Sequence, residues 1–247
     1  MKLAIISDEI SRDFDTAVEI GTSWGIRNFE VRMTPSGRVP RITDADRKQL
    51  LAVRKKYGIT VSSISPGFFK DPLESDAVAE GMKEGLPKAF DLARELGTQK
   101  VVVFGFLKPK VSHTDPMAVP GRDYPSAVVD KLGEMVAAAE KADVILYLEN
   151  EPVCWGDTGL TTAEIIRKVG SARLRMNWDP GNACSSGATP FPDEHMQIKD
   201  LIGHTHIKDI KRTATGRQVV PVGEGDVDWR GVLKQLYQDG YDGYHTI

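Results

Sequence analysis

The feature that most constrains this chain is a regular alternation of short apolar runs with longer amphipathic segments. The apolar runs have the length of buried strands, and the segments between them have helical spacing. The expected strands cover residues 3–7, 28–32, 59–64, 100–104, 144–148, 174–178, 203–207 and 244–247. The expected helices cover residues 15–24, 75–96, 126–141, 162–169, 194–201 and 229–238, with one more between Thr43 and Gly58. This alternation predicts a parallel sheet, and eight strands predict an α/β fold closed as a (β/α)8 TIM barrel.

The length of 247 residues suits one such barrel, so residues 1–247 are expected to form a single domain. An open, doubly wound sheet is the alternative. It is disfavoured because Ser-Asp-Glu-Ile-Ser, rather than a glycine-rich phosphate turn, follows the first expected strand. The chain ends at Ile247, inside its eighth expected strand, and we expect the natural protein to continue into a C-terminal helix that is missing here.

Charge and composition narrow the class of partner. The net charge is −3 and the isoelectric point is near 6.0, so no basic field favours nucleic acid. No apolar run approaches the ~20 residues of a membrane span, and the apolar start of the chain is too short for a signal peptide. Two cysteines, Cys154 and Cys184, do not make a disulfide framework. A cytoplasmic protein is the simplest interpretation.

Three consecutive expected strands end in side chains that bind metals. Their ends read Leu-Glu-Asn-Glu-Pro at residues 148–152, Asn-Trp-Asp-Pro-Gly-Asn at 177–182 and His-Thr-His-Ile-Lys-Asp at 204–209. The carboxyl ends of barrel strands form one rim, so Glu149, Asp179 and His206 are expected at one level. Carboxylate oxygens and imidazole nitrogens are ligands of Mn²⁺, Mg²⁺, Co²⁺ and Zn²⁺. Because side chains alternate along a strand, Asn150 is expected to point away from this rim, and His204 to pack below it.

These runs, taken in order, resemble the xylose isomerase-like TIM barrel superfamily, which includes sugar phosphate isomerases and epimerases and the AP endonuclease family 2 proteins of the endonuclease IV kind. The family's strand-five acid matches Glu149, its strand-six aspartate matches Asp179, and its strand-seven histidine matches His206. Residues 222–229 look like the turn before the family's seventh helix. The resemblance covers the whole chain and implies a carbohydrate substrate and a divalent metal ion bound by these three residues.

The chain departs from the family pattern in two places. The family's fourth ligand is usually a glutamate that ends strand eight, and we expect it directly after Ile247; without it, Glu151 is the best substitute. Ketose 3-epimerases of the family often carry a histidine three residues after the aspartate, where this chain has Asn182. A substrate pose that depends on this histidine is therefore not implied, and Asn182 is a candidate substrate contact.

The activity implied is proton transfer beside a carbonyl group, through an enediolate, by a metal-dependent isomerase or epimerase of a sugar, sugar phosphate or keto-sugar. Glu149 or the expected strand-eight glutamate would move the proton, and Glu151 is a further catalytic candidate. Lys208 would neutralise negative charge on the intermediate. A salt bridge from Lys208 to Asp209 or Glu151 is the alternative interpretation.

Other side chains near the expected strand ends are candidates for binding substrate. Arg32 ends the second expected strand and offers a further positive charge. Trp155 and Phe68 follow strand ends, where they would either form walls of a sugar pocket or pack in the core.

Three other functions stay open. A keto-sugar or inositol-type dehydratase or lyase would use the same metal and a similar enolate. An endonuclease IV-type nuclease is less favoured, because it needs histidines at the ends of strands three and four, where residues 63–67 and 104–106 have none. The last alternative is a non-catalytic sugar-binding barrel, and the sequence leaves open whether the protein is a homo-oligomer.

Overall fold

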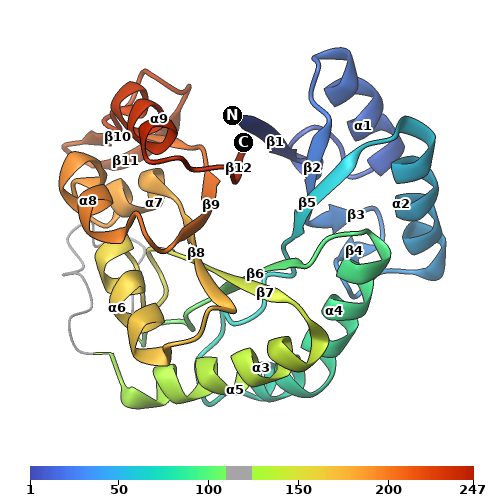
Figure 1. Ribbon diagram of the computed structural model, residues 1–247, viewed down its shortest axis with the longest axis horizontal. Coiled ribbons are helices and arrows are strands. Elements are labelled where there is room, and N and C mark those ends of the chain that lie inside the picture. Colours follow the sequence, from blue (N-terminus) through green and yellow to red (C-terminus); the bar gives the residue numbers. More distant parts are fainter. Residues whose placement is uncertain (110–123) are drawn as a thin grey trace.

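Eight parallel strands close into a barrel in the computed structural model, which describes residues 1–109 and 124–247 (Figure 1). The barrel strands are β1 (Lys2–Ile6), β2 (Asn28–Val31), β5 (Thr60–Ile64), β6 (Lys100–Phe104), β7 (Ile145–Glu149), β8 (Leu174–Trp178), β9 (Ile202–His206) and β12 (Tyr244–Thr246). They neighbour one another in chain order, and β12 pairs with β1 to complete the cylinder. The predicted (β/α)8 barrel is therefore confirmed.

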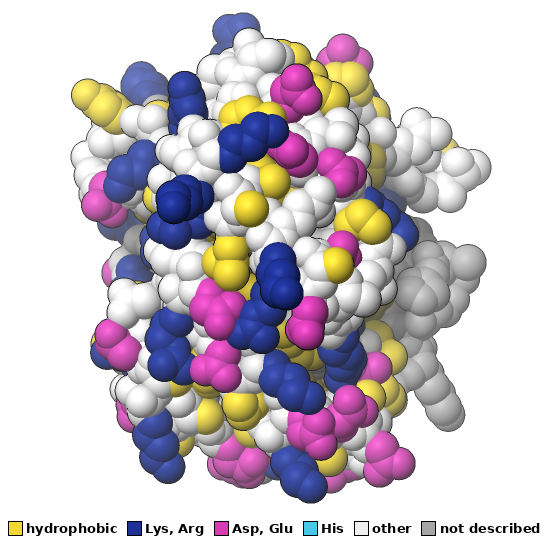
Figure 2. Space-filling model, turned by 90° about the vertical axis from the view of Figure 1, so that its right-hand side faces the viewer, with side chains coloured by type: hydrophobic (Ala, Val, Ile, Leu, Met, Phe, Trp, Pro, Cys, Tyr) yellow, Lys and Arg dark blue, Asp and Glu magenta, His cyan; other side chains and the backbone are white. Residues whose placement is uncertain are grey.

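Helices surround the barrel on its outer side (Figure 1). They are α1 (Phe14–Ser23), α2 (Asp44–Tyr57), α3 (Asp76–Glu80), α4 (Leu86–Glu95), α5 (Ser126–Ala142), α6 (Gly159–Val169), α7 (Pro180–Ser185), α8 (His195–Ile198) and α9 (Trp229–Gln238). The end signals of α2 act as expected, because the Thr43 side chain accepts a hydrogen bond from Asp46 N and Gly58 adopts a left-handed conformation. The face carrying α1 and α2 has interspersed acidic and basic side chains (Figure 2).

Two kinds of side chain fill the inside of the barrel. One group is apolar and comes mainly from β6 and β7: Val102, Phe104 and Tyr147, joined by Cys154. The other group is polar and fully buried, and consists of Glu30 on β2, Ser63 on β5, Asn177 on β8, His204 on β9 and Thr246 on β12. Buried polar groups need hydrogen-bond partners, so closing the barrel requires these side chains to bond to one another.

Several expected loops contain regular structure. The expected loop over residues 33–42 contains a hairpin of β3 (Met33–Thr34) and β4 (Gly37–Arg38). The expected loop over residues 213–228 contains β11 (Gly216–Val220), which pairs with β10 (Asp209–Thr213). Within the described parts of the chain, each hairpin pairs only with itself and most of its residues are not buried. The sequence therefore shows no buried, strand-length apolar run at these places. The expected loop over residues 108–123 lies largely outside the described residues.

The expected helices differ from the observed ones in three places. A loop was expected after Pro180, but α7 begins there, because Pro suits the first position of a helix and Asp179 caps it. The helix expected over residues 75–96 is interrupted by a wider turn at Gly81–Gly85. The helix expected over residues 194–201 narrows to α8, which follows an irregular turn at Pro190–Glu194.

The two ends of the chain meet where the barrel closes (Figure 1). Ile6 N donates to Ile247 O at 2.7 Å, and Ile247 N donates to Ala4 O at 3.0 Å. Cys154 and Cys184 are both buried free thiols. Among the helices of the described ranges, none is both long and apolar enough to cross a membrane.

Candidate metal centre

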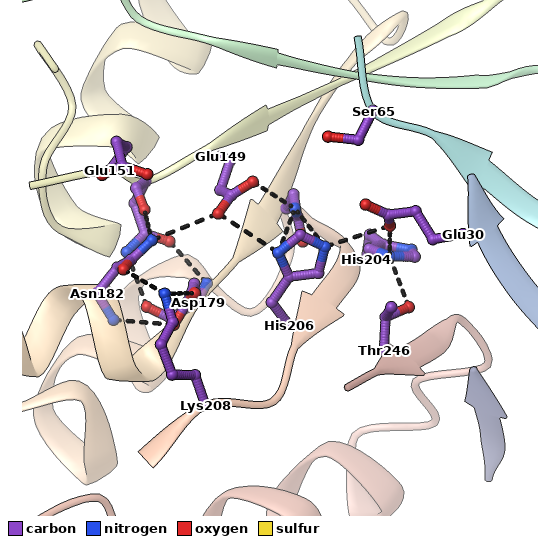
Figure 3. A network of polar contacts seen from close by, with 12 residues as sticks. Glu30, Ser65, Glu149, Glu151, Asp179, Asn182, His204, His206, Lys208 and Thr246 are labelled. Atoms are coloured by element: carbon purple, nitrogen blue, oxygen red, sulfur yellow. Dashed lines mark hydrogen bonds and ion pairs between the residues drawn. The ribbon is translucent and has the colours of Figure 1, made fainter. Parts of the chain in front are cut away.

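The three side chains expected to bind a metal converge at one end of the barrel. Glu149 is the last residue of β7, Asp179 directly follows β8, and His206 is the last residue of β9. All three are buried, and each offers one ligand atom that lies within 4.8 Å of the other two (Figure 3). Two carboxylates and an imidazole at this separation fit a divalent cation. Their role as ligands stays a prediction.

His206 lies between two carboxylates. Its Nδ1 is 3.4 Å from Glu149 Oε1, and its Nε2 is 3.2 Å from Glu30 Oε2. Burial by itself would lower the pKa of His206, but the charges of Glu149 and Glu30 raise it well above the ordinary value. Burial raises the pKa of Glu149, and the opposing charge of His206 outweighs it, so this carboxyl stays ionised. A cation bound to Nδ1 would therefore compete with a proton.

Asp179 is held from two sides. Its Oδ1 accepts a hydrogen bond from Asn182 N at 2.8 Å, which caps α7, and its Oδ2 lies 2.9 Å from Lys208 Nζ. Lys208 Nζ also donates to Asn182 Oδ1 at 2.7 Å. Burial lowers the pKa of Lys208, but the charges of Asp179 and Glu149 raise it overall. The alternative interpretation, in which Lys208 forms a salt bridge to Asp209 or Glu151, is wrong. The lysine pairs with Asp179, a candidate metal ligand.

Asn150 fixes the turn that carries Asp179. Its Oδ1 accepts from Asp179 N at 2.8 Å, and its Nδ2 donates to Asp179 O at 2.8 Å. Its own carbonyl accepts from Asn182 Nδ2 at 2.9 Å. Sequence reasoning gave Asn150 no role, although its side chain bonds to both backbone groups of a candidate ligand. The alternation of side chains along a strand could have predicted this role, because a side chain directed outward at the end of one strand can reach the turn that follows the neighbouring strand.

Glu30 was also missed, and it lies directly behind His206. Its Oε2 accepts from Ser63 Oγ at 2.8 Å and lies 3.2 Å from Nε2 of both His204 and His206. Burial raises the pKa of Glu30, but the His206 charge and hydrogen bonds from both imidazoles bring it well below the ordinary value. The signal for Glu30 is an acid that stands between two apolar residues, Phe29 and Val31, within a short strand.

In the neutral form of His206, which metal binding requires, this arrangement selects the tautomer. When Glu30 accepts a hydrogen bond from His206 Nε2, the Nδ1 lone pair is left facing Glu149 and Asp179. His204 lies below, as expected, stacked on Tyr147 with ring centroids 5.4 Å apart. Because the distances to Glu30 are ordinary hydrogen-bond distances, we assign Glu30 an orienting role rather than a place in a second metal site.

Two other predicted charged residues are paired with neighbours. Arg32 Nη2 lies 2.7 Å from both Asp8 Oδ2 and Glu9 Oε1. Glu151 Oε2 lies 2.6 Å from Lys70 Nζ. Their catalytic or substrate-binding roles stay predictions.

The two aromatic candidates lie outside the hydrogen-bonded cluster of the metal centre. Phe68 is buried and lines a cleft of about 250 Å³ together with Arg38 and Arg41. Trp155 is partly buried against the core, and its backbone N donates to Phe106 O at 2.9 Å. Whether either contacts substrate stays a prediction.

Comparison with known proteins agrees with this architecture. The family model described as "Xylose isomerase-like TIM barrel" matches residues 18–247, so the chain belongs to this family and the resemblance drawn from the three strand ends is confirmed. Uncharacterized protein MJ1311 of Methanocaldococcus jannaschii is 27% identical over 209 residues, which span 81% of this chain and 68% of that protein.

Two solved structures have a similar fold at low sequence identity. The probable 3-DHS dehydratase AsbF of Bacillus anthracis, involved in petrobactin synthesis, matches with a TM-score of 0.77 and 19% identity, covering 100% of this chain and 92% of that chain. A D-tagatose 3-epimerase-like protein matches with a TM-score of 0.77 and 22% identity, covering 100% of this chain and 90% of that chain.

Proposed function

We propose that this protein is a divalent-metal-dependent isomerase or epimerase that acts on a sugar, sugar phosphate or keto-sugar. The observation that carries the proposal is the convergence of three buried donor atoms, from Glu149, Asp179 and His206, at the carboxyl end of the barrel. Active sites of this fold lie at that end. The family and the epimerase-like structural neighbour support the same class of chemistry.

Glu149, Asp179 and His206 would hold the metal ion. Their chemistry fits Mn²⁺, Mg²⁺, Co²⁺ or Zn²⁺, since two hard carboxylates are combined with one imidazole. When bound, such an ion supplies Lewis acidity that stabilises negative charge on substrate oxygens. His206 would lose its proton on binding the ion, and Glu30 would keep its ring in place.

The proton step belongs to the side chains of the chain itself. Glu149 would take a proton from the carbon beside the substrate carbonyl, which leaves an enediolate. In an isomerase the proton returns from Glu149 to the neighbouring carbon. In an epimerase a second acid, for which Glu151 is the candidate, would give a proton to the opposite face of the same carbon, and solvent would restore both carboxyl groups, so no electrons are gained or lost. The Lys208 ammonium, 2.9 Å from Asp179 Oδ2, is placed to offset the negative charge of that intermediate.

Solvent deuterium exchange tests this function. Purified protein with added Mn²⁺ is incubated in D₂O with a panel of ketoses and their phosphates, and NMR follows deuterium at the carbon beside the carbonyl. We expect incorporation by the wild type. A complete panel without exchange or turnover would contradict the proposal.

Variants at the three candidate ligands extend this test to the metal. We expect Glu149→Gln, Asp179→Asn and His206→Ala to lose both exchange and bound metal, measured by elemental analysis. The matched control is Glu164→Gln, an exposed carboxylate paired with Lys168 at 2.9 Å, which should keep both. Full metal occupancy in all three variants would remove the ligand assignment.

A dehydratase or lyase is the second candidate, and the structural neighbour named as a probable dehydratase favours keeping it. The same proton removal by Glu149 would then be followed by loss of a hydroxyl group as water, with Lys208 as the proton donor. The products separate the two, because elimination releases a water and lowers the mass of the product, whereas isomerisation leaves the mass unchanged. A nuclease is not supported, because among the described residues the ligand clusters draw nothing from β5 or β6.

A further inference from the structure

The positive charges around the metal centre differ in how they are compensated. Most of them lie within ion-pair distance of a carboxylate of the same chain. The pairs are Lys208 with Asp179, Arg32 with Asp8 and Glu9, and Lys70 with Glu151. Among the residues that the structure describes, Arg38 forms no such pair. Its positive charge is therefore not neutralised directly by a described carboxylate and is available to a bound anion.

Arg38 is placed at the active end of the barrel. It ends β4, in the hairpin that follows the carboxyl end of β2. Its Nε donates to Ser65 O at 3.0 Å and its Nη2 donates to Ser65 Oγ at 3.3 Å. Ser65 directly follows β5, and in the view of Figure 3 it lies between Glu149 and Glu30. The guanidinium is thus anchored on the same rim as the candidate metal ligands.

The chain makes room for this guanidinium. Gly67 has a φ of +73°, and a Cβ at that position would overlap the Arg38 guanidinium. The absence of a side chain at residue 67 therefore leaves room for the guanidinium in the position that it occupies. Arg38 also lines the cleft of about 250 Å³ that Phe68 and Arg41 share, so space adjoins it.

The electrostatics of Arg38 are those of an incompletely compensated charge. Burial, followed by the positive charge of Arg32, lowers its pKa from the ordinary value, and the more distant carboxylates of Asp8, Glu149 and Glu30 only partly oppose this. An arginine in a protein keeps its proton, so the charge persists. Nη1 donates to no acceptor among the described residues, which leaves part of the planar fork free to bind an anion.

We infer that Arg38 binds an anionic group of the substrate, so the substrate is an acidic keto-sugar that carries a carboxylate or a phosphate. The inference rests on the proposed function, which places the reacting carbons of the substrate at Glu149. The anionic group of the same substrate is then assigned to Arg38. Carboxylate and phosphate share the geometry that a guanidinium fork recognises. Binding at Arg38 would fix one end of the substrate and hold the carbonyl end at the metal centre.

Three matched ligands test the inference by calorimetric titration of the Mn²⁺-loaded protein: D-fructose, D-fructose 6-phosphate and D-fructuronate. We expect at least one anionic ligand to bind about 10-fold or more tightly than fructose. Arg38→Gln should lower the affinity for that anion by roughly 10- to 100-fold, because one charge-assisted contact is lost, and should leave Mn²⁺ affinity unchanged. A preference for the phosphate identifies a sugar phosphate, and a preference for the carboxylate identifies a sugar acid.

Arg38→Gln is chosen because glutamine can still donate to the Ser65 carbonyl, and thermal unfolding checks that the fold persists. The matched control is Arg167→Gln, an exposed arginine on α6 paired with Asp200 at 3.0 Å, which should not change anion affinity. Equal affinity for all three ligands, no binding of either anion, or an unchanged anion preference in Arg38→Gln would each overturn the inference.

Solvent exchange on the same samples separates this inference from the proposed function. If ketoses exchange deuterium equally in wild type and Arg38→Gln, the result supports the isomerase and contradicts the anion site. If an anion binds in an Arg38-dependent way but no ligand exchanges deuterium, the result supports the anion site and contradicts the isomerase.

Discussion

His206 is the residue on which the candidate centre depends most, because each of its ring nitrogens faces a different carboxylate. Nδ1 faces Glu149 and Nε2 faces Glu30. The first contact belongs to the candidate metal centre, and the second decides which nitrogen carries the proton when the ring is neutral. Metal-binding histidines commonly donate their second nitrogen to such a group, which orients the ring.

Removing Glu30 should therefore weaken metal binding without removing a ligand. We expect Glu30→Ala to lower Mn²⁺ affinity roughly 10- to 100-fold, and Glu30→Gln to lower it less, because the amide oxygen still accepts from Nε2. Titration calorimetry measures the affinity, and nitrogen NMR of the imidazole reports the tautomer. The exposed Glu164→Gln serves as the control. Wild-type affinity and tautomer in Glu30→Ala would show that Glu30 only fills space.

At the scale of elements, the turn between β8 and α7 is held by its neighbour β7. Asn150 bonds both backbone groups of Asp179, so the turn that carries this candidate ligand is fixed to the end of the adjacent strand. The strand over residues 174–178 was predicted with the bounds that it has. Its continuation into α7 was not, because a Pro-Gly pair marks both a loop and the first turn of a helix.

Asn150→Ala should lower both the stability of the protein and its affinity for metal. Two buried backbone groups lose their partners, which we expect to lower the free energy of unfolding by about 2–4 kcal/mol in urea titrations. Mn²⁺ affinity should fall as well. The control is Asn28→Ala, which removes a side-chain bond to Leu3 O at 2.8 Å at the other end of the barrel. Asn28→Ala should lose stability but keep metal affinity; equal losses of affinity in both variants would contradict the assignment.

Glu194 links the turn before α8 to the start of α6. Its Oε1 accepts from Leu160 N at 3.1 Å, and its Oε2 accepts from Trp178 Nε1 at 3.4 Å. Burial raises the pKa of Glu194 from an ordinary 4.5 to about 6, more than these hydrogen bonds lower it. Between those pH values the folded protein binds more protons than the unfolded chain, so its stability falls as pH rises through the window and then levels off.

We therefore expect wild type to lose about 2 kcal/mol relative to Glu194→Gln as the pH rises from 4.5 to 7, because the glutamine does not ionise. Urea unfolding of both proteins at several pH values gives the difference. Parallel stability curves across this range would show that Glu194 is not the group responsible.

At the scale of the whole molecule, the barrel brings together residues that are far apart in the chain. His206 and Glu30 are separated by 176 positions, and β9 and β2 meet through their side chains only inside the closed cylinder. A metal ion at this point would tie together β7, β8 and β9, and through Glu30 also β2. Ligand binding to the folded state alone stabilises it by mass action.

Metal ions should therefore raise the melting temperature. At a Mn²⁺ concentration 100 times the dissociation constant, we expect about 2.7 kcal/mol of added stability and a rise of roughly 5–10 °C. A chelator should reverse the rise, and His206→Ala should not show it; calorimetric melting measures both. The same rise in His206→Ala would mean that the ion binds elsewhere.

The pattern of residues along the chain was enough to predict the barrel and the three strand ends that carry Glu149, Asp179 and His206. Strand and helix periods are local properties, and the carboxyl ends of parallel strands meet at one rim whatever the details of packing. The partners of these residues follow from the three-dimensional packing alone: Glu30 contacts His206, Asn150 and Lys208 contact Asp179, and Arg38 pairs with no carboxylate of residues 1–109 and 124–247. These contacts depend on how the strands are aligned when the barrel closes and on which side chains then point into its interior. Neither property produces a periodic pattern in the sequence.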